Sequence, residues 1–359
     1  MKIERVQLTV VEMQQNWPVA PYTHRSGESS KTRRLICKLT TDDGAAGWGE
    51  ASGIPPAEVA ALQEKLQAQM RERSPFDVEG FYATVQCGSL SNQSAVEMAL
   101  WDLMGKACGQ PVYNLLGGLC RRHVPLAACM GISKFEEAGK KALKYKEMGF
   151  KTVKTKAGRD AAQDLETVRG FRDAVGMDLD LRIDANQGYS PEVALKLCQD
   201  LELYNLQYFE QPCPREALAG IAELRKQTSI PIALNESCGP LEEIPEIIRL
   251  DACDVLMPDT PQCGGILKVK KIAAITEAAG IPCVMHCGHD LGVKTAMMLH
   301  VAAATPNFTM GNDSTYYSMQ DDILAEPFEI VDGGIFVRDL PGLGADVEEG
   351  KLRKYEVRE

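Results

Sequence analysis

Seven ionisable side chains stand at the ends of apolar, strand-like runs between residues 150 and 290 of the chain. They are Lys154, Lys156, Asp184, Glu210, Glu236, Asp259 and His286. Any one of them could be a solvated rim residue. Six successive runs that all end in this way indicate that the runs meet at one edge and build a single site there.

Three of these residues are carboxylates at equal spacing, since Asp184 and Glu210 are 26 residues apart and so are Glu210 and Glu236. Equal strand–helix units would bring the three groups to one height, where they would repel each other unless a cation lay between them. Oxygen ligands favour Mg²⁺, with Mn²⁺ as a second choice, and the lack of Cys or His at these positions disfavours zinc. The alternative is that each carboxylate pairs with a lysine or arginine of the rim.

Lys154 and Lys156 are two residues apart on one predicted strand, so both ammonium groups face the same side. Two neighbouring ammonium groups repel, which predicts a lowered pKa for each, and such a lysine can act as a general base. The alternative is a pair of solvated lysines on an exposed sheet edge. That alternative is weak if the strands close into a barrel, because a closed barrel has no exposed edge.

Asp259 and His286 end successive predicted strands. The carboxylate can therefore hold one ring nitrogen of the imidazole and leave the other free to move a proton. His289 is the alternative to His286 in this role. Asn186, two residues after Asp184, is expected to contact the substrate.

The two predicted bases suggest a reaction. If Lys156 and His286 reach the site from opposite sides, a carboxylate bound at the metal would have its α-carbon between them. Removal of the α-proton produces an enediolate, whose extra negative charge a divalent cation stabilises. The predicted chemistry is α-proton abstraction through a metal-stabilised enediolate.

Strands and helices alternate regularly from Val124 onward. The predicted strands are VPLAACM, FKTVKTK, LDLRIDA, LQYFEQ, IPIALNE, DVLMPD, IPCVMH and FTMGND. Eight strands with helical crossovers predict an α/β fold with a (β/α)8-type barrel in the modified (β/α)7β form, whose active site lies at the C-terminal strand ends. A doubly wound open sheet is disfavoured because no GxGxxG turn follows the first strand.

The chain before the barrel has a different pattern. Residues 1–120 predict an N-terminal α+β capping domain, with a hairpin in RRLICKLTTDDGAAGWGE and helices at Pro56–Arg73 and Ser94–Cys108. The barrel is expected at 121–322. The remaining segment, 323–359, is expected to pack back on the capping domain.

Composition excludes several classes of function. The net charge of the 359 residues is −11 and no stripe of Lys and Arg occurs, so we expect neither a nucleic-acid partner nor an anionic membrane. No run approaches the ~20 apolar residues that span a bilayer, and the start lacks the apolar core of a signal peptide. Twelve scattered cysteines predict reduced, buried thiols in a cytoplasmic protein.

A set of motifs covers essentially the whole chain. It comprises WGEAS, ALWDLMGKACGQPVYNLLGG, VKTK, RIDANQGY, FEQP, LNES, PDTPQCGG and the His286 segment. With these motifs the chain resembles the enolase superfamily, specifically its mandelate racemase subgroup. The resemblance implies that Mg²⁺ is bound by Asp184, Glu210 and Glu236.

The same resemblance implies the roles of the bases. Lys156 would be the base on one face, with Lys154 lowering its pKa and touching the substrate carboxylate. Asp259 and His286 would form the opposing dyad. The muconate lactonizing branch would have a lysine at the sixth strand, where this chain has Asp259, so that branch is disfavoured.

Two regions depart from the family pattern or are specific to this chain. The mandelate racemase pattern has a glutamate on the last strand that hydrogen-bonds the substrate carboxylate. Here that segment reads MGNDS, so Asp313 is the best candidate and Asn312 the alternative. The family's specificity loop corresponds to Asn16–Ser30, and a second loop follows Glu50. Three residues of the first loop, Tyr22, His24 and Arg25, are either substrate contacts or solvated loop positions.

Two outcomes fit the same acid–base pair. Dehydration of a sugar acid that carries a β-hydroxyl is the favoured reaction by resemblance, and racemisation or epimerisation of an α-substituted acid is the alternative. A non-catalytic metal-binding or sensor barrel is the third hypothesis. The expected partner is a small carboxylic acid, and the family's habit suggests a homo-oligomer, either a dimer or an octamer.

Overall fold

The N-terminal strands form an antiparallel sheet. The computed structural model describes residues 1–358, in which β1 (Ile3–Gln14) pairs with β4 (Lys31–Thr41), and β4 pairs with β5 (Ala46–Ser52). The β4–β5 turn contains Gly44 at φ +83°, a conformation that glycine adopts without a Cβ clash. This confirms the hairpin predicted at the Asp-Asp-Gly segment.

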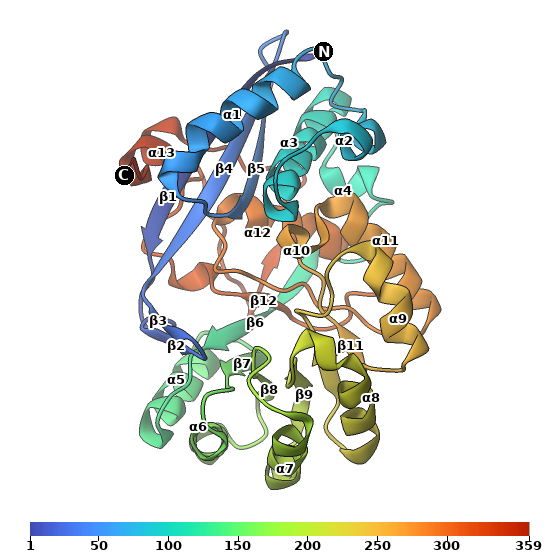
Figure 1. The fold of residues 1–359 in the computed structure, drawn as a ribbon. Coiled ribbons are helices and arrows are strands. Elements are labelled where there is room, and N and C mark those ends of the chain that lie inside the picture. Colours follow the sequence, from blue (N-terminus) through green and yellow to red (C-terminus); the bar gives the residue numbers. More distant parts are fainter. Residues whose placement is uncertain (359) are drawn as a thin grey trace.

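Four helices complete the cap above the barrel (Figure 1). They are α1 (Pro56–Met70), α2 (Val78–Thr84), α3 (Leu90–Cys108) and α4 (Val112–Leu115). Helix α3 begins earlier than the predicted Ser94 because the Ser89 side chain accepts a hydrogen bond from the Asn92 amide and caps the helix. It ends at Gly109, which is left-handed at φ +62°.

The second half is the predicted barrel. Its strands are β6 (His123–Met130), β7 (Thr152–Lys156), β8 (Asp180–Asp184), β9 (Leu206–Glu210), β10 (Ile232–Leu234), β11 (Val255–Leu256) and β12 (Asn312–Ser314). The helices between them are α5 (Phe135–Glu147), α6 (Ala161–Val175), α7 (Pro191–Leu201), α8 (Leu218–Gln227), α9 (Ile244–Arg249), α10 (Thr260–Cys263), α11 (Ile266–Ala278) and α12 (Gly292–Ala303).

Residues 283–285 close the ring of strands between β11 and β12. The amide of Val284 donates to the carbonyl of Leu256 on one side, and the amide of Asp313 donates to the carbonyl of Met285 on the other. Since β12 pairs in parallel with β6, eight strand positions form a closed barrel. No α-helix of the described chain follows β12 before β13, only a 3-10 turn at Tyr316–Ser318, so the (β/α)7β prediction is confirmed.

The C-terminal segment contacts both halves of the molecule. Strand β13 (Gly334–Phe336) pairs antiparallel with β6 of the barrel. Helix α13 (Glu349–Tyr355) lies beside β1 of the cap (Figure 1), and the Val357 amide donates to the Val10 carbonyl at 2.8 Å. All twelve cysteines are free, and within residues 1–358 no helix has the length and apolarity that a membrane crossing requires.

The close packing of β5 on α3 gives a test of the cap. A Cβ atom added at Gly49 would lie 1.8 Å from the carbonyl oxygen of Ala95. We expect Gly49→Ala to lower the free energy of unfolding by about 2–3 kcal/mol, because the helix would have to move away from the strand. Chemical denaturation measures this. The matched substitution Gly350→Ala on exposed α13 should leave the free energy of unfolding unchanged or raise it by up to about 1 kcal/mol, because alanine favours a helix more than glycine does. Equal losses in the two variants would contradict the packing argument.

Candidate active site

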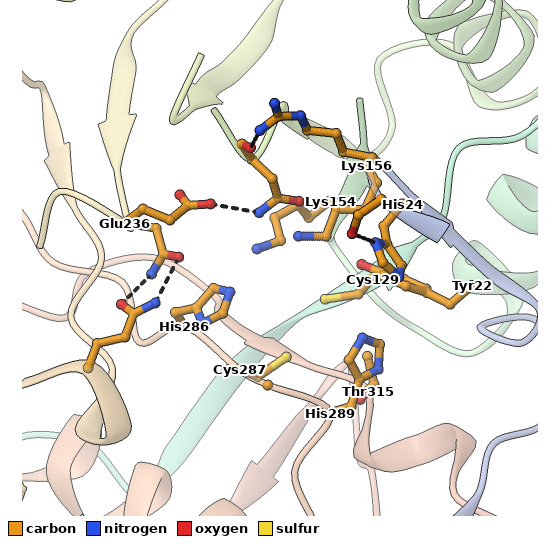
Figure 2. Close-up of a pocket in the computed structure, with 16 residues that line it drawn as sticks. Tyr22, His24, Cys129, Lys154, Lys156, Glu236, His286, Cys287, His289 and Thr315 are labelled. Atoms are coloured by element: carbon orange, nitrogen blue, oxygen red, sulfur yellow. Dashed lines mark hydrogen bonds between the residues drawn. The ribbon is translucent and has the colours of Figure 1, made fainter. Parts of the chain in front are cut away.

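A cavity of about 580 Å³ opens at the C-terminal ends of the barrel strands, beneath the cap (Figure 2). Its lining joins side chains from the barrel with the short hairpin of β2 (Tyr22–His24) and β3 (Gly27–Ser29). The predicted residues on its wall are Tyr22, His24, Arg25, Lys154, Lys156, Asn186, Glu236 and His286. The fold therefore brings most of the predicted site residues to one place.

Both lysines of β7 are buried and paired with carboxylates. The Lys154 ammonium lies 2.5 Å from Asp313 Oδ2 and 3.0 Å from Glu210 Oε2, and Lys156 pairs with Asp184. Burial pulls the pKa of Lys156 down, and Lys154 adds to that effect, but Asp184 pushes it up and the net shift is upward. The predicted lowering of the lysine pKa values is therefore wrong for this arrangement, because carboxylate attraction outweighs ammonium repulsion.

The three predicted metal ligands lie on neighbouring strands without converging on one point. Asp184 and Glu210 are direct register partners at the ends of β8 and β9, and Glu236 lies two residues beyond β10. Within residues 1–358, the side chains that offer ligand atoms within 4.8 Å of one another are Glu210, His286 and Asp313. The Lys154 ammonium already bridges Glu210 and Asp313, so two of the three members of this second set are paired with a protein cation.

The predicted ligands nevertheless fit a hard divalent cation by their chemistry. All three are carboxylates, and the buried Oε2 of Glu236 has no hydrogen-bond partner in the described chain. Burial and the neighbouring Asp184 raise the pKa of both Glu210 and Glu236. A cation bound between these carboxylates would lower both pKa values, because it would offset the repulsion from Asp184 and the cost of burial.

The Asp259–His286 pair has the geometry of an acid–base dyad. The imidazole Nδ1 lies 3.1 Å from Asp259 Oδ2. Burial raises the pKa of Asp259, but Lys294 and His286 outweigh it and hold that pKa well below its usual range. The charged carboxylate therefore accepts a hydrogen bond from Nδ1–H, and Nε2 is left for the substrate.

A buried chain of charges, which the sequence reasoning missed, links this dyad to the cap. Lys294 on α12 lies 2.8 Å from Asp259 Oδ1 and 2.6 Å from Asp290 Oδ2, and Asp290 lies 2.7 Å from Arg34 on β4. Arg34 in turn donates to Glu50 on β5 at 2.9 Å. Each ionic group has an opposite partner, as buried charges require.

Glu50 also caps α12. Its carboxylate accepts hydrogen bonds from the backbone amides of Leu291 and Lys294 at 2.7 and 2.9 Å, which satisfies two amides that a helix N-terminus leaves free. Glu50 and Lys294 are distant in sequence and neither ends a barrel strand. The sequence carries one sign of this buried chain, which is a charged residue within an apolar run. It occurs twice, at Arg34 in RRLIC and at Lys294 in LGVKTAMML.

The last-strand residues do not reach the main cavity wall. Asp313 is buried between Lys154 and Arg182, whose Nη1 lies 3.4 Å from Asp313 Oδ1. Asn312 Oδ1 accepts the Met285 amide at 2.9 Å and so helps to close the barrel. The structure thus shows a structural contact for Asn312, and substrate binding by Asp313 stays a prediction.

The predicted specificity loop forms the β2–β3 hairpin over the cavity. Arg25 Nη1 donates to the carbonyl of Asn186 at 3.0 Å, which joins the hairpin to the loop after β8. Asn186 Nδ2 donates to Glu236 Oε1 at 3.1 Å (Figure 2), so its amide holds a predicted metal ligand. Burial, followed by Lys156, lowers the pKa of His24, whose Nδ1 lies 3.1 Å from Ser26 Oγ.

Comparison with known families accounts for both domains. Residues 7–117 match the profile described as mandelate racemase / muconate lactonizing enzyme, N-terminal domain. Residues 137–351 match the profile described as enolase C-terminal domain-like. The first match lies within the cap, and the second runs from α5 through the rest of the barrel into the C-terminal segment.

Individual relatives cover nearly the whole chain. An arabinonate dehydratase of Saccharolobus solfataricus is 30% identical over 90% of this chain and 91% of its own. An enolase from Streptomyces coelicolor, described as a sugar isomerase candidate, has a TM-score of 0.90 and 33% identity, covering 99% and 96% of the two chains. A dipeptide epimerase from Enterococcus faecalis, complexed with Mg and L-Leu-L-Tyr, has a TM-score of 0.88 and 27% identity, covering 96% and 99%.

The buried charge chain can be tested through stability. We expect Lys294→Met to lower the free energy of unfolding by about 3–5 kcal/mol, because Asp259 and Asp290 would lose a buried cation. The double variant Lys294→Met/Asp290→Asn should recover part of this loss, since it also removes one of the two carboxylates. Urea denaturation compares the three proteins. A double variant less stable than the single one would contradict the charge pairing.

Proposed function

The chain belongs to the mandelate racemase / muconate lactonizing enzyme family of the enolase superfamily, and from this we propose that it abstracts the α-proton of a small carboxylic acid and dehydrates a sugar acid. One observation carries the proposal. Lys156 on β7 and His286 after the seventh strand position line one cavity, together with the predicted metal ligand Glu236. Two groups able to move protons on one cavity wall support acid–base chemistry on a substrate bound there.

We assign Asp184, Glu210 and Glu236 as ligands of Mg²⁺, with Mn²⁺ as a second choice. The dipeptide epimerase structure with bound Mg supports this choice, as do the carboxylate donors and the unpartnered Oε2 of Glu236. Such a cation supplies positive charge, which stabilises the enediolate oxygens and lowers the proton affinity of nearby amines. Side chains of the protein transfer the protons and bind the substrate.

The lysines act on one face of the substrate. Lys156 Nζ accepts the α-proton in its neutral form, and the Lys154 ammonium donates hydrogen bonds to the substrate carboxylate. Both side chains are buried, so water competes little with the substrate for them. Asp313, which lies 2.5 Å from Lys154, orients that ammonium and is a candidate for a substrate contact of its own.

His286 acts on the other face. Asp259 accepts a hydrogen bond from Nδ1–H, and His286 enters this step as the imidazolium, so Nε2–H gives its proton to the departing β-hydroxyl oxygen and the ring is left neutral. The C–O bond breaks, water leaves, and the electrons from the α-carbon form the double bond to the β-carbon. The resulting enol becomes a 2-keto acid. Asp259 keeps its charge throughout because Lys294 and His286 stabilise the carboxylate.

The alternative is racemisation or epimerisation, in which His286 returns a proton to the α-carbon from the opposite face. Relatives named as epimerases and racemases support it, and relatives named as dehydratases support the first reaction. A β-hydroxyl in the substrate decides between them. A sensor barrel is the third alternative, and it would exchange no α-hydrogen.

The surroundings of the reaction follow from the same assignment. We propose a small carboxylic acid as the partner, a cytoplasmic location, and a homo-oligomer of two or eight chains. Twelve free cysteines support a reducing compartment. Light scattering of the purified protein measures the assembly directly.

Exchange of the substrate α-hydrogen in D₂O with Mg²⁺ tests the two bases. We expect Lys156→Ala to reduce exchange and turnover of an active acid by at least about 100-fold, because the base is lost. His286→Asn should stop dehydration while Lys156 still exchanges the α-hydrogen. In a racemase, each variant would instead lose exchange with one enantiomer. Unchanged α-hydrogen exchange in both variants would contradict the assignment of the two bases.

The metal site is tested by stability and by activity together. Mg²⁺ at 100-fold its Kd should stabilise the folded protein by about 2.7 kcal/mol, and a chelator should stop α-hydrogen exchange. Glu236→Gln should remove most of the Mg²⁺ stabilisation, while the exposed control Glu242→Gln on the same loop should keep it. Thermal unfolding with and without Mg²⁺ measures both, and equal responses would argue against Glu236 as a ligand.

A further inference from the structure

His289 lies on the cavity wall and has no part in the proposed proton transfers. Figure 2 shows its ring on the same side of the cavity as that of His286, with Cys287 between them. The sequence offered it as an alternative to His286 in the dyad. The structure instead pairs Asp259 with His286 and holds His289 through residues of the cap.

A short hydrogen-bond chain determines which nitrogen of His289 carries the proton. The Ser318 hydroxyl donates to the Thr315 carbonyl at 2.7 Å, so its oxygen is left to accept. Gln15 therefore turns its NH₂ group toward Ser318, at 3.4 Å. The same nitrogen lies 3.0 Å from His289 Nδ1, which must accept. The ring is thus the tautomer with hydrogen on Nε2.

The cap fixes the position of the ring as well as its tautomer. The edge of Tyr22 packs against it with 4.5 Å between the ring centroids, and Thr32 Oγ1 donates to the His289 carbonyl at 2.8 Å. His289 has φ +60°, a left-handed conformation that is uncommon for a residue with a side chain. Such conformations persist where surrounding contacts over-determine them, and they cluster at functional sites.

The remaining nitrogen is available to a ligand. Within residues 1–358, His289 Nε2 has no hydrogen-bond partner, and the side chain is partly exposed on the cavity wall. Burial and the nearby Lys156 ammonium lower the pKa of His289 to about 3. The ring is therefore a neutral donor near neutral pH, with Nε2–H free to donate to an oxygen of a ligand in the cavity.

The surrounding wall favours an oxygen-rich ligand. The side chains that line the cavity together with His289 include Tyr22, His24, Ser26, Cys129, Cys287 and Thr315, none of them a carboxylate, and the adjacent Asp290 is already paired with Arg34 and Lys294. The one carboxylate on the cavity wall is Glu236, which we assign to the metal. An ammonium group on the distal part of a substrate would find no counter-ion here, whereas hydroxyl groups would find donors and acceptors.

We propose that His289 is a substrate-binding residue whose Nε2–H donates a hydrogen bond to a hydroxyl oxygen of the substrate beyond its reacting carbons, and that Gln15 of the cap sets the required tautomer. The preferred substrate is then a polyhydroxylated acid rather than an aminoacyl compound. This inference rests on the proposed function for the position of the reacting carbons. It assigns a discriminating contact to a residue outside the acid–base machinery.

The tautomer is tested first, on the protein without substrate. Long-range ¹H–¹⁵N spectra of ¹⁵N-histidine-labelled protein at pH 7 should show His289 with its proton on Nε2, assigned by loss of the signal in His289→Gln. Gln15→Glu replaces the donor by an acceptor and should move the proton to Nδ1 or protonate the ring. A proton on Nδ1 in the unmodified protein would overturn the proposal, as would an unchanged spectrum in Gln15→Glu.

Binding is tested with matched acids and matched variants. The probes are aldonates of four to six carbons, compared with 2-hydroxyalkanoates of the same length, each with Mg²⁺ by calorimetry. We expect His289→Phe to weaken binding of the best aldonate about 10-fold, as for one lost hydrogen bond. It should change 2-hydroxyalkanoate binding less than about twofold. His289→Gln, which keeps an N–H near that place, should restore most of the aldonate affinity.

The control is His123→Phe. His123 begins β6, at the end of the strand away from the cavity, and its imidazole donates to the Val331 carbonyl at 2.9 Å. This substitution should leave all affinities unchanged. Equal losses for both acid series in His289→Phe, or no aldonate binding to the unmodified protein, would overturn the proposal. Failure of the proposed function is seen separately, as absent α-hydrogen exchange. In that case an aldonate could still bind in a His289-dependent way.

Discussion

The ion pairs between the two lysines of β7 and the carboxylates around them are the interaction on which the site depends. Lys154 lies between Glu210 and Asp313, and Lys156 pairs with Asp184. These groups are buried at the mouth of a closed barrel, where an unpaired charge would be costly. Mutual neutralisation lets the chain fold with five ionic groups in one place. The proposed binding of a metal and a carboxylate substrate would require the same groups to exchange partners.

The cap contributes to the site through charge and hydrogen bonds as well as by covering it. Arg34 and Glu50 extend a line of ion pairs through Asp290 and Lys294 to the Asp259–His286 dyad. Gln15 orients the ring of His289. Contacts between the cap and the barrel therefore position both the Asp259–His286 pair and the part of the cavity wall that carries His289. A change in the cap can thus alter chemistry at the barrel without touching the substrate.

Local sequence patterns were sufficient to predict the barrel strands and helices and to identify the residues at the strand ends. Period-two runs and helical crossovers predicted eight strand positions, and the register then places Lys156 beside Asp184 and Asp184 beside Glu210. The direction of the lysine pKa values was wrong because the prediction considered only the nearest like charge. The carboxylates that reverse it come from β8, β9 and β12, so their distances were not contained in the spacing along the chain.

By itself, the sequence determined the barrel, the alternation that points Lys154 and Lys156 inward, and the acids and bases at the strand ends, because these follow from backbone periodicity. Only the tertiary structure decided which charges pair. It showed that Lys294 supports Asp259, that Asn186 holds Glu236, and that Asn312 closes the ring of strands. The physical reason is that hydrogen bonds and ion pairs act over about 3 Å. These contacts join residues of different strands and loops, so they depend on how the elements of the barrel pack, which no local pattern records.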